Sequence, residues 1–148
     1  MAFIQTSVQR YRDPAFEGAM VDQQVNNLFT RRADEEIPFG KVVLQGATDG
    51  SCKLPDDSGA AYLGVSVRDQ STGAESPNSF PANSSVRIAD KGTIWVRVGA
   101  AVNAGERAAY LTADGSIVKS GTADSTGIDG GKFMTSAGTG ELAQLKLS

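Results

Sequence analysis

The sequence predicts an all-β fold, either a jelly-roll-like sandwich or a small barrel of about 8–10 short strands with an N-terminal arm. The main observation is a series of short apolar runs with a period of two residues, each bounded by turn-forming residues. A second observation is the glycine content of 17 in 148 residues, which exceeds the average usage of about 7% and lacks the three-residue period of collagen. Strands do not alternate with helical patterns, which argues against a doubly wound α/β fold.

Composition and charge narrow the class of protein. A chain of 148 residues with 40% hydrophobic and 21% charged residues is typical of one globular domain. The net charge of −3 and the scattered positions of the 14 Lys and Arg residues predict no nucleic acid partner, because phosphate backbones require a basic surface. No apolar run approaches the roughly 18 residues of a membrane span, and Met1 to Arg10 lacks the features of a signal peptide. We expect a soluble protein with no membrane partner, made in a reducing cytoplasm.

The sequence contains no recognisable catalytic or metal-binding constellation. It has no histidine, which excludes Ser-His-Asp and Cys-His catalysis. Lys53 could lower the pKa of the neighbouring Cys52 thiol, but we interpret Cys52 as a small apolar filler of a strand. Asp56 and Asp57 lie in a turn without the alternating acidic positions of a calcium loop, so we expect them to bond to their own backbone. We predict no enzyme activity, no cofactor and no metal.

The first 36 residues differ from the remainder of the chain and are predicted to form an N-terminal arm, before a β-rich body over 37–148. Only one of the 17 glycines, Gly18, lies in this segment. Its apolar and aromatic side chains are spaced among polar residues, and they would pack either on the protein's own body or on a neighbouring subunit. These side chains are Phe3, Tyr11, Phe16, Met20 and Phe29.

The conformation of the arm is open between two alternatives. Val21, Val25 and Leu28 fall at helical spacing, so a short helix from about Met20 to Thr30 is one of them. The other is an extended arm, because the asparagines at 26 and 27 are mediocre helix formers and no convincing cap precedes the segment.

The first half of the body is predicted to contain three strands and a long loop. Pro38 restricts pairing of the first strand to Gly40 and beyond, because proline is tolerated only at the start or edge of a strand. The strand over 61–68 has Leu63, Val65 and Val67 directed inward. These elements are a strand over 37–44, a turn over 46–50, a return strand over 52–54, the strand over 61–68, and an exposed loop over 69–83 with Phe80 as its apolar anchor.

The second half is predicted to be a meander followed by two terminal strands. In the strand over 92–99, Ile94, Val96 and Val98 lie on one side, while Trp95 and Arg97 lie on the other. The predicted elements are a strand over 85–89, a tight turn over 90–92, strands over 92–99, 107–112 and 117–119 joined by turns at 103–106 and 113–116, a loop over 120–131, and strands over 132–135 and 141–147.

A succession of short motifs runs through most of residues 37–148. They are Phe39-Gly-Lys-Val-Val43, Leu63-Gly-Val-Ser-Val67, Gly92-Thr-Ile-Trp-Val-Arg-Val98, Val102-Asn-Ala-Gly-Glu106, Ala113-Asp-Gly115, Gly131-Lys-Phe-Met-Thr-Ser136 and Glu141-Leu-Ala-Gln-Leu-Lys-Leu147. Each motif is common by itself, but their order and spacing resemble the capsid cement proteins of tailed bacteriophages, also called head decoration proteins.

The resemblance implies a non-enzymatic structural virion protein that binds the outer surface of the major capsid protein shell and cements neighbouring capsomers. It further implies a homo-oligomer, dimer or trimer, that is made in the host cytoplasm and whose arm lies across neighbouring capsid subunits. The loops over 69–83 and 120–131 are candidate contacts, and deletion of Met1 to Arg32 should leave a folded body that no longer occupies capsids. The candidate contact residues are Phe3, Tyr11, Arg12, Phe16, Met20, Phe29, Phe80, Trp95 and Arg97.

A carbohydrate- or receptor-binding β-sandwich module of a phage tail or fibre is the alternative function. Such a module requires aromatic side chains gathered on one exposed face. Tyr62, Trp95 and Tyr110 are the candidates for that face.

Overall fold

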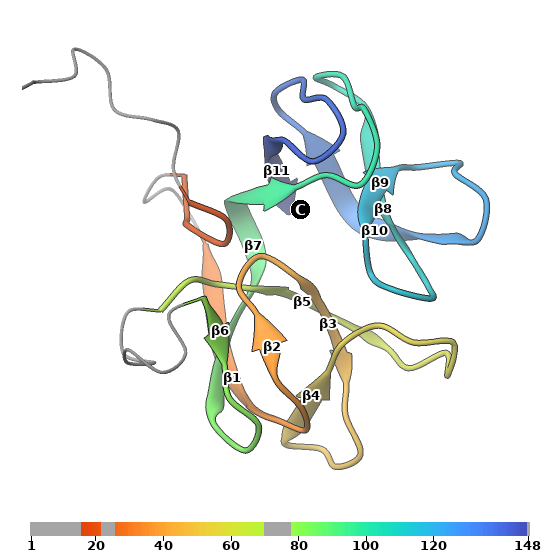
Figure 1. Ribbon diagram of the computed structural model, residues 1–148. Helices are drawn as coiled ribbons and strands as arrows, with labels where there is room; N and C mark the ends of the chain where they lie inside the picture. Colours follow the sequence, from red (N-terminus) through yellow and green to blue (C-terminus); the bar gives the residue numbers. More distant parts are fainter. Residues whose placement is uncertain (1–15, 22–25, 70–77, 148) are drawn as a thin grey trace, which may run out of the picture.

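The computed structural model describes residues 16–21, 26–69 and 78–147, and within these ranges the secondary structure is entirely β (Figure 1). The predicted all-β class is therefore confirmed. The described part of the chain contains no helix of the length and apolarity needed to cross a membrane. The strands are β1 (Asn27–Ala33), β2 (Ile37–Pro38), β3 (Val42–Gln45), β4 (Ser51–Lys53), β5 (Tyr62–Ser66), β6 (Ser79–Phe80), β7 (Ser85–Arg97), β8 (Arg107–Leu111), β9 (Ile117–Lys119), β10 (Ser125–Phe133) and β11 (Leu142–Leu147).

Nine of these strands form one sheet in the order β1-β4-β3-β5-β7-β11-β10-β8-β9, and β2 and β6 pair separately. Because β1 also pairs with β7, the strands β1, β4, β3, β5 and β7 close into a ring. We call this ring the barrel. The strands β11, β10, β8 and β9, with the C-terminal half of β7, form the wing (Figure 1). Of the two predicted architectures, the small barrel is the one that is observed.

Strand β7 connects the barrel to the wing. Its N-terminal half pairs with β1 and β5, and its C-terminal half pairs with β11. The tight turn predicted over 90–92 is wrong, because the strand runs through these residues with a register shift opposite Asn27 and Leu28. Gly92 has a φ of 119°, and a Cβ atom there would lie 2.9 Å from Cε of Met20. The turn-like signal marks a bulge and a close approach rather than a reversal.

The predicted meander over 92–119 is only partly correct. Strands β8 and β9 form the expected hairpin, but β11 and β10 lie between β7 and β8. The C-terminal strand occupies this place because its alternating side chains match β7, with Leu145 opposite Ile94 and Ala143 opposite Val96. All four of these side chains are fully buried. Burial of a long-range pair has therefore overridden pairing between sequence neighbours.

Two segments predicted as loops contain strands. Residues 125–131 of the expected loop over 120–131 belong to β10, which pairs with β8 and shifts register between Gly127 and Lys132. The glycines there accommodate the irregular backbone of a bulged strand. In the expected loop over 69–83, β6 pairs with β2, so that Phe80 lies opposite Ile37.

The predicted arm also contributes a strand to the barrel. Residues Asn27–Ala33 form β1, which pairs in antiparallel fashion with β7 and in parallel with β4. The helix over Met20 to Thr30 is therefore wrong for its described part, because residues 27–30 are extended and Met20 makes a β-bridge with Ile94. The residues 1–15 and 22–25 lie outside the described residues.

The core consists of two clusters that alternate across the barrel strands. The barrel cluster receives side chains from all five strands of the ring and fills it; its members are Ala33, Ile37, Phe39, Val43, Cys52, Phe80, Val86 and Ile88, with Phe29, Leu54 and Leu63 packed against them. The wing cluster contains Ile94, Val96 and Val98, as predicted. It also contains the opposite faces of β3 and β5, including Val65 and Val67. Leu63 faces the barrel cluster instead, because the register shifts between Val43 and Leu44.

Candidate functional site

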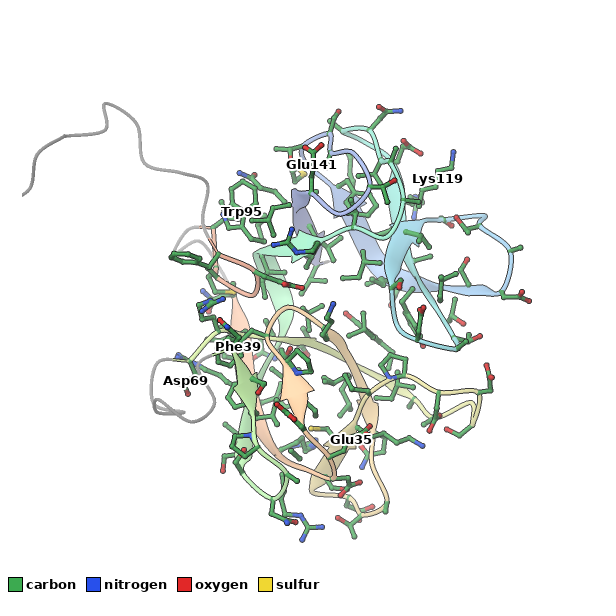
Figure 2. All side chains as sticks on the ribbon, viewed as in Figure 1. Glu35, Phe39, Asp69, Trp95, Lys119 and Glu141 are labelled. Atoms are coloured by element: carbon green, nitrogen blue, oxygen red, sulfur yellow. The ribbon has the colours of Figure 1, made fainter. Side chains whose placement is uncertain are left out.

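The most elaborate set of contacts on the surface surrounds residues Phe16 to Val21, which we call the arm root. This segment adds itself to the free edge of β7 in the wing. The amides of Gly18 and Val21 donate to the carbonyls of Trp95 and Thr93 at 2.8 and 2.9 Å, and the Trp95 amide donates to the Ala19 carbonyl at 2.9 Å. Figure 2 labels Trp95. The arm root is therefore held by sheet-type hydrogen bonds and not by side chains alone.

Gly18 allows three segments to converge at the arm root. Its φ is +82°, and a Cβ atom at this position would lie 2.8 Å from both the amide nitrogen of Gly40 and Cβ of Phe39. Its carbonyl accepts a hydrogen bond from the amide of Arg68 at 2.8 Å. No residue with a side chain fits this position without displacing its neighbours. Sequence reasoning assigned Gly18 no role, although it is the single glycine of the first 36 residues.

The Arg68 guanidinium joins the arm root to the barrel. It stacks between the rings of Phe16 and Phe39, 5.0 Å from each centroid, and its Nε donates to the Glu17 carbonyl at 3.1 Å. The Phe39 ring in turn makes an edge contact with Phe80 at 5.0 Å between centroids. The cation and the rings thus form a continuous stack from the surface to the barrel interior.

The Glu17 carboxylate joins the arm root to both halves of the molecule. It lies 3.4 Å from Nζ of Lys41 beside the barrel and 3.6 Å from Nε of Arg97 in the wing. The Arg97 Nη1 also donates to the Gly140 carbonyl at 2.5 Å. Because these groups are partly exposed, each ion pair contributes modestly, and together they orient the segment.

A cleft of about 440 Å³ opens beside this stack. It is lined by Phe16, Glu17, Pro38, Phe39, Arg68, Asn78, Arg97 and Leu142. Phe16 stands at its rim with 71% of its surface exposed, the largest exposure of any described bulky apolar side chain. An exposed aromatic ring beside fixed cations provides a surface suited to a protein contact.

The predicted contact residues fall into three groups. Phe16 and Arg97 lie in the arm root cleft, and Trp95 pairs with the arm root through its backbone. Phe80 is only 1% exposed, so this side chain belongs to the protein's own core and offers no surface to a partner. Phe3, Tyr11 and Arg12 lie outside the described residues.

Two further candidates, Met20 and Phe29, are half-buried against the body. Met20 packs on the wing cluster, and Phe29 packs on the barrel cluster beneath the Arg31 guanidinium, which lies 5.0 Å from its ring centroid. Both side chains therefore pack at least in part on their own chain, which was one of the two alternatives for the aromatic residues of the arm.

The acidic turn and the cysteine have structural roles. Asp56 accepts hydrogen bonds from the Ser58 amide and hydroxyl and pairs with Lys53 Nζ at 2.9 Å, which lowers the pKa of Asp56 to about 2. Cys52 is fully buried, and this burial, with a smaller effect of Asp34, raises the pKa of its thiol to about 11. Because its side chain packs inside the barrel cluster, the filler role of Cys52 is confirmed.

No group of three potential metal ligands occurs in the described part of the chain.

The aromatic face required by the alternative function does not form. Tyr62 and Tyr110 stack on each other at 6.1 Å between centroids, but Tyr110 is 5% exposed and the Tyr62 hydroxyl is buried. Burial raises the pKa of Tyr62 well above its ordinary value. Trp95 pairs with the arm root elsewhere, so the three rings present no common platform.

The molecule is thus an all-β protein, a small barrel with a wing, and an N-terminal segment is fastened to its surface by backbone hydrogen bonds. Residues 4–148 match the family described as structural cement protein (E217 gp24/Pam3 gp6). The chain therefore belongs to this family of phage structural proteins, and it is a structural protein of the virion.

Two solved structures share the fold. The first is a chain of the capsid of Myoviridae phage XM1, with a TM-score of 0.77 and 17% identity over 100% of this chain and 98% of that chain. The second is the N base of head fiber gp8.5 of bacteriophage phi29, with a TM-score of 0.54 and 16% identity over 84% of this chain and 95% of that chain. No curated protein sequence matches the chain.

Proposed function

We propose that the protein binds the outer surface of the major capsid protein shell as a dimer or trimer and cements neighbouring capsomers. Residues 1–15 lie across the adjacent capsid subunits in this proposal, and the arm root is their anchor. The proposal includes synthesis in the host cytoplasm and no contact with nucleic acid, since an acidic protein is repelled by packaged DNA.

The arm root carries this proposal. Its backbone is fastened to β7 by three hydrogen bonds, yet the ring of Phe16 at its N-terminal end is 71% exposed. The fifteen residues that precede Phe16 can span at most about 50 Å when fully extended, which is enough to reach beyond a domain of this size. They include Phe3, Tyr11 and Arg12, residue types that are enriched at protein interfaces.

Weak individual contacts are sufficient for such a cement. Many copies that bridge a symmetric shell gain avidity, because each further contact forms at a high effective concentration. A domain without a disulfide or metal also gains stability by mass action when it binds a partner.

The experiment is deletion of residues 1–15 with Phe16 retained, followed by co-sedimentation with undecorated capsids. The deletion of Met1 to Arg32 that the sequence suggested is unsuitable, because it removes most of β1 and opens the barrel. We expect the shorter deletion to keep the unfolding temperature and circular dichroism of the full chain while it loses occupancy of the capsids. A truncated protein that decorates shells at full occupancy would refute the role of the arm.

A further inference from the structure

The outer face of the wing carries a row of cations directly opposite one another. Lys132 of β10 pairs across the sheet with Arg107 of β8 on one side and with Lys146 of β11 on the other. All three residues are exposed. A second row beside the first contains Met134, Gln144 and Trp95, since Met134 donates its amide to the Gln144 carbonyl and Gln144 lies opposite Trp95. We call these six residues the cationic face.

The row of three cations does not stabilise the fold. Like charges directly opposite each other in a sheet destabilise it, because their side chains lie only about 5 Å apart. Within residues 16–21, 26–69 and 78–147, none of the three cations has a carboxylate within 4.0 Å. The protein as a whole has 17 acidic and 14 basic residues, so a run of three unpaired cations is not a consequence of composition.

The cationic face is also hollowed and partly apolar. The register shift of β10 between Gly127 and Lys132 leaves extra backbone beside β8. A cleft of about 340 Å³ results, lined by Gly105, Arg107, Gly130, Gly131 and Lys132. The adjacent row adds Met134, which is 45% exposed, and the half-buried Trp95. Arg, Met and Trp are the residue types enriched in protein interfaces, so this surface fits a protein that presents carboxylates.

We propose that the cationic face docks the acidic end of the barrel of a second copy of this chain. That end carries the exposed carboxylates Glu35 and Asp49. The loops that hold them are tied together, because Asp34 accepts a hydrogen bond from the Ala47 amide at 2.9 Å and Glu35 accepts one from the Leu54 amide at 3.0 Å. Figure 2 shows Glu35 at the end of the barrel remote from the wing. The inference stands apart from shell binding and does not depend on it.

The positions of the two surfaces determine the kind of assembly. The cationic face and the acidic end of the barrel are different surfaces on opposite sides of the molecule, so a contact between them is head-to-tail. Repetition of this contact either closes a ring of copies or continues from copy to copy. Exposed ion pairs contribute little individually and are screened by salt. The contact is therefore weak between free copies and strengthens when a shell holds the copies close together.

The test uses a carbodiimide, which condenses a carboxylate with a lysine amine in contact and so records a weak interface. A mixture of ¹⁴N- and ¹⁵N-labelled full-length chains identifies the links that join different copies. We expect mixed-isotope peptides that connect Lys132 or Lys146 with Glu35 or Asp49, and we expect their yield to fall in 0.5 M NaCl, where the Debye length is only about 4 Å.

The variant Arg107→Glu keeps both lysines, so a change in yield reports the charge of the row and not the loss of a reactive amine. We expect the yield of these links to fall about tenfold, which corresponds to about 1.4 kcal/mol. The matched control Arg87→Glu alters an exposed arginine of the barrel half of β7 and should leave the yield unchanged. Arg107→Glu should unfold at the same temperature as the parent or higher, because it removes a like-charge pair.

Three results would overturn the proposal. One is the absence of mixed-isotope links to Lys132 and Lys146, and another is an unchanged yield in Arg107→Glu. The third is that Arg107→Glu no longer binds capsids while its links between copies persist. The cationic face would then contact the shell protein and not a second copy. The deletion of residues 1–15 tests the arm separately, so failure of one proposal is distinguishable from failure of the other.

Discussion

The barrel and the wing share β7 but differ in how its edges are covered. In the barrel, β1 and β5 pair with β7 on its two sides, and the strands close on one another. In the wing, β11 covers one edge and the arm root covers the other. The barrel strands therefore pair with one another around the ring, whereas an edge of β7 in the wing is covered by a segment from the other end of the chain. Surfaces that interact with partners are expected where closure is incomplete.

The two cores differ in the same way. The barrel cluster is enclosed by the ring and by β2 and β6. The wing cluster includes Val42, Leu44, Val65 and Val67, which point outward from the barrel strands. The wing thus needs the outer face of the barrel to complete its core, and the two parts should unfold together.

The largest expected effects come from two of the buried phenylalanines, Phe80 in the barrel cluster and Phe133 in the wing cluster. Each is 1% exposed or less, so Phe80→Ala and Phe133→Ala should each lower the free energy of unfolding by about 3–5 kcal/mol. Urea unfolding followed by far-UV circular dichroism and by fluorescence of Trp95, the single tryptophan, measures both values.

The comparison of the barrel with the wing depends on whether circular dichroism and Trp95 fluorescence report the same unfolding transition. We expect one shared transition in each variant, because the wing cluster extends onto the barrel. Separate transitions for the two probes would show that the barrel and the wing are independent units. Met134→Ala, at a partly exposed position of the wing, should change stability by less than about 0.5 kcal/mol and serves as the control.

The second effect concerns the junction of the two parts. Gly18→Ala should cost about 1–3 kcal/mol, because it adds a Cβ atom at positive φ against the backbone of Gly40. Gly105→Ala is the matched control, since its φ is +92° but no atom lies within 4 Å of the added Cβ. The difference between the two free energies of unfolding isolates crowding from backbone strain. Equal losses in the free energy of unfolding would mean that the arm root shifts to accommodate the added Cβ atom at no energetic cost.

The third effect contrasts two aspartates. In the barrel, the Ala47 amide, with the Ser51 hydroxyl and the Arg32 guanidinium, holds the pKa of Asp34 below its ordinary value of 3.8, although burial opposes this. In the wing, the Ser116 amide lowers the pKa of Asp114, but this bond spans only two residues. Asp34→Asn should therefore lower the unfolding temperature at pH 7 more than Asp114→Asn does.

The pH dependence has a definite sign. A carboxylate whose pKa is depressed in the folded state stabilises the protein above the unfolded value of 3.8, and this contribution disappears as pH falls through the lower folded value. Thermal unfolding between pH 7 and pH 2 should show a weaker acid dependence in Asp34→Asn than in the parent. An unchanged acid dependence would contradict the assignment.

The smallest effect on stability is expected at the ion pairs of the arm root. Glu17→Gln should lower the free energy of unfolding by only about 0–1 kcal/mol, because the partners Lys41 and Arg97 are partly exposed. Hydrogen exchange of the Gly18 and Val21 amides should nevertheless accelerate as the arm root opens more often. Glu141→Gln, an exposed glutamate of the wing, is the control and should leave these amides protected.

The local patterns in the sequence predicted elements more reliably than they predicted neighbours. Period-two alternation identified the buried faces of Ile94, Val96 and Leu145 correctly, because alternation depends only on which side of a strand meets the core. It did not predict that β11 would lie beside β7, since many registers satisfy the same alternation. Gly92 was interpreted as part of a turn and Gly127 as part of a loop, whereas both lie at bulges within strands.

The candidate site was predictable only in its parts. The aromatic residues of the first 36 positions predicted a segment that packs either on the body or on a neighbouring subunit, and Phe16 and Arg97 were both chosen from sequence. Nothing in the sequence indicated that Arg68 would stack between Phe16 and Phe39, because these residues come together only when the arm root, the segment before β3 and the end of β5 meet. Phe80 was misjudged because an apolar residue in a polar loop looks the same from sequence whether it is buried or exposed.

The sequence by itself determined the all-β class and the faces of most strands, because these depend on composition and on local alternation. The family was indicated by the resemblance of its motifs, in their order and spacing, to those of capsid cement proteins. Only the tertiary structure decided which strands pair, that the ring closes through β1 and β7, and where the N-terminal segment is anchored. Those features depend on contacts between residues far apart in the chain. Local sequence patterns do not rank the alternative strand pairings by free energy, because each pairing buries different long-range contacts.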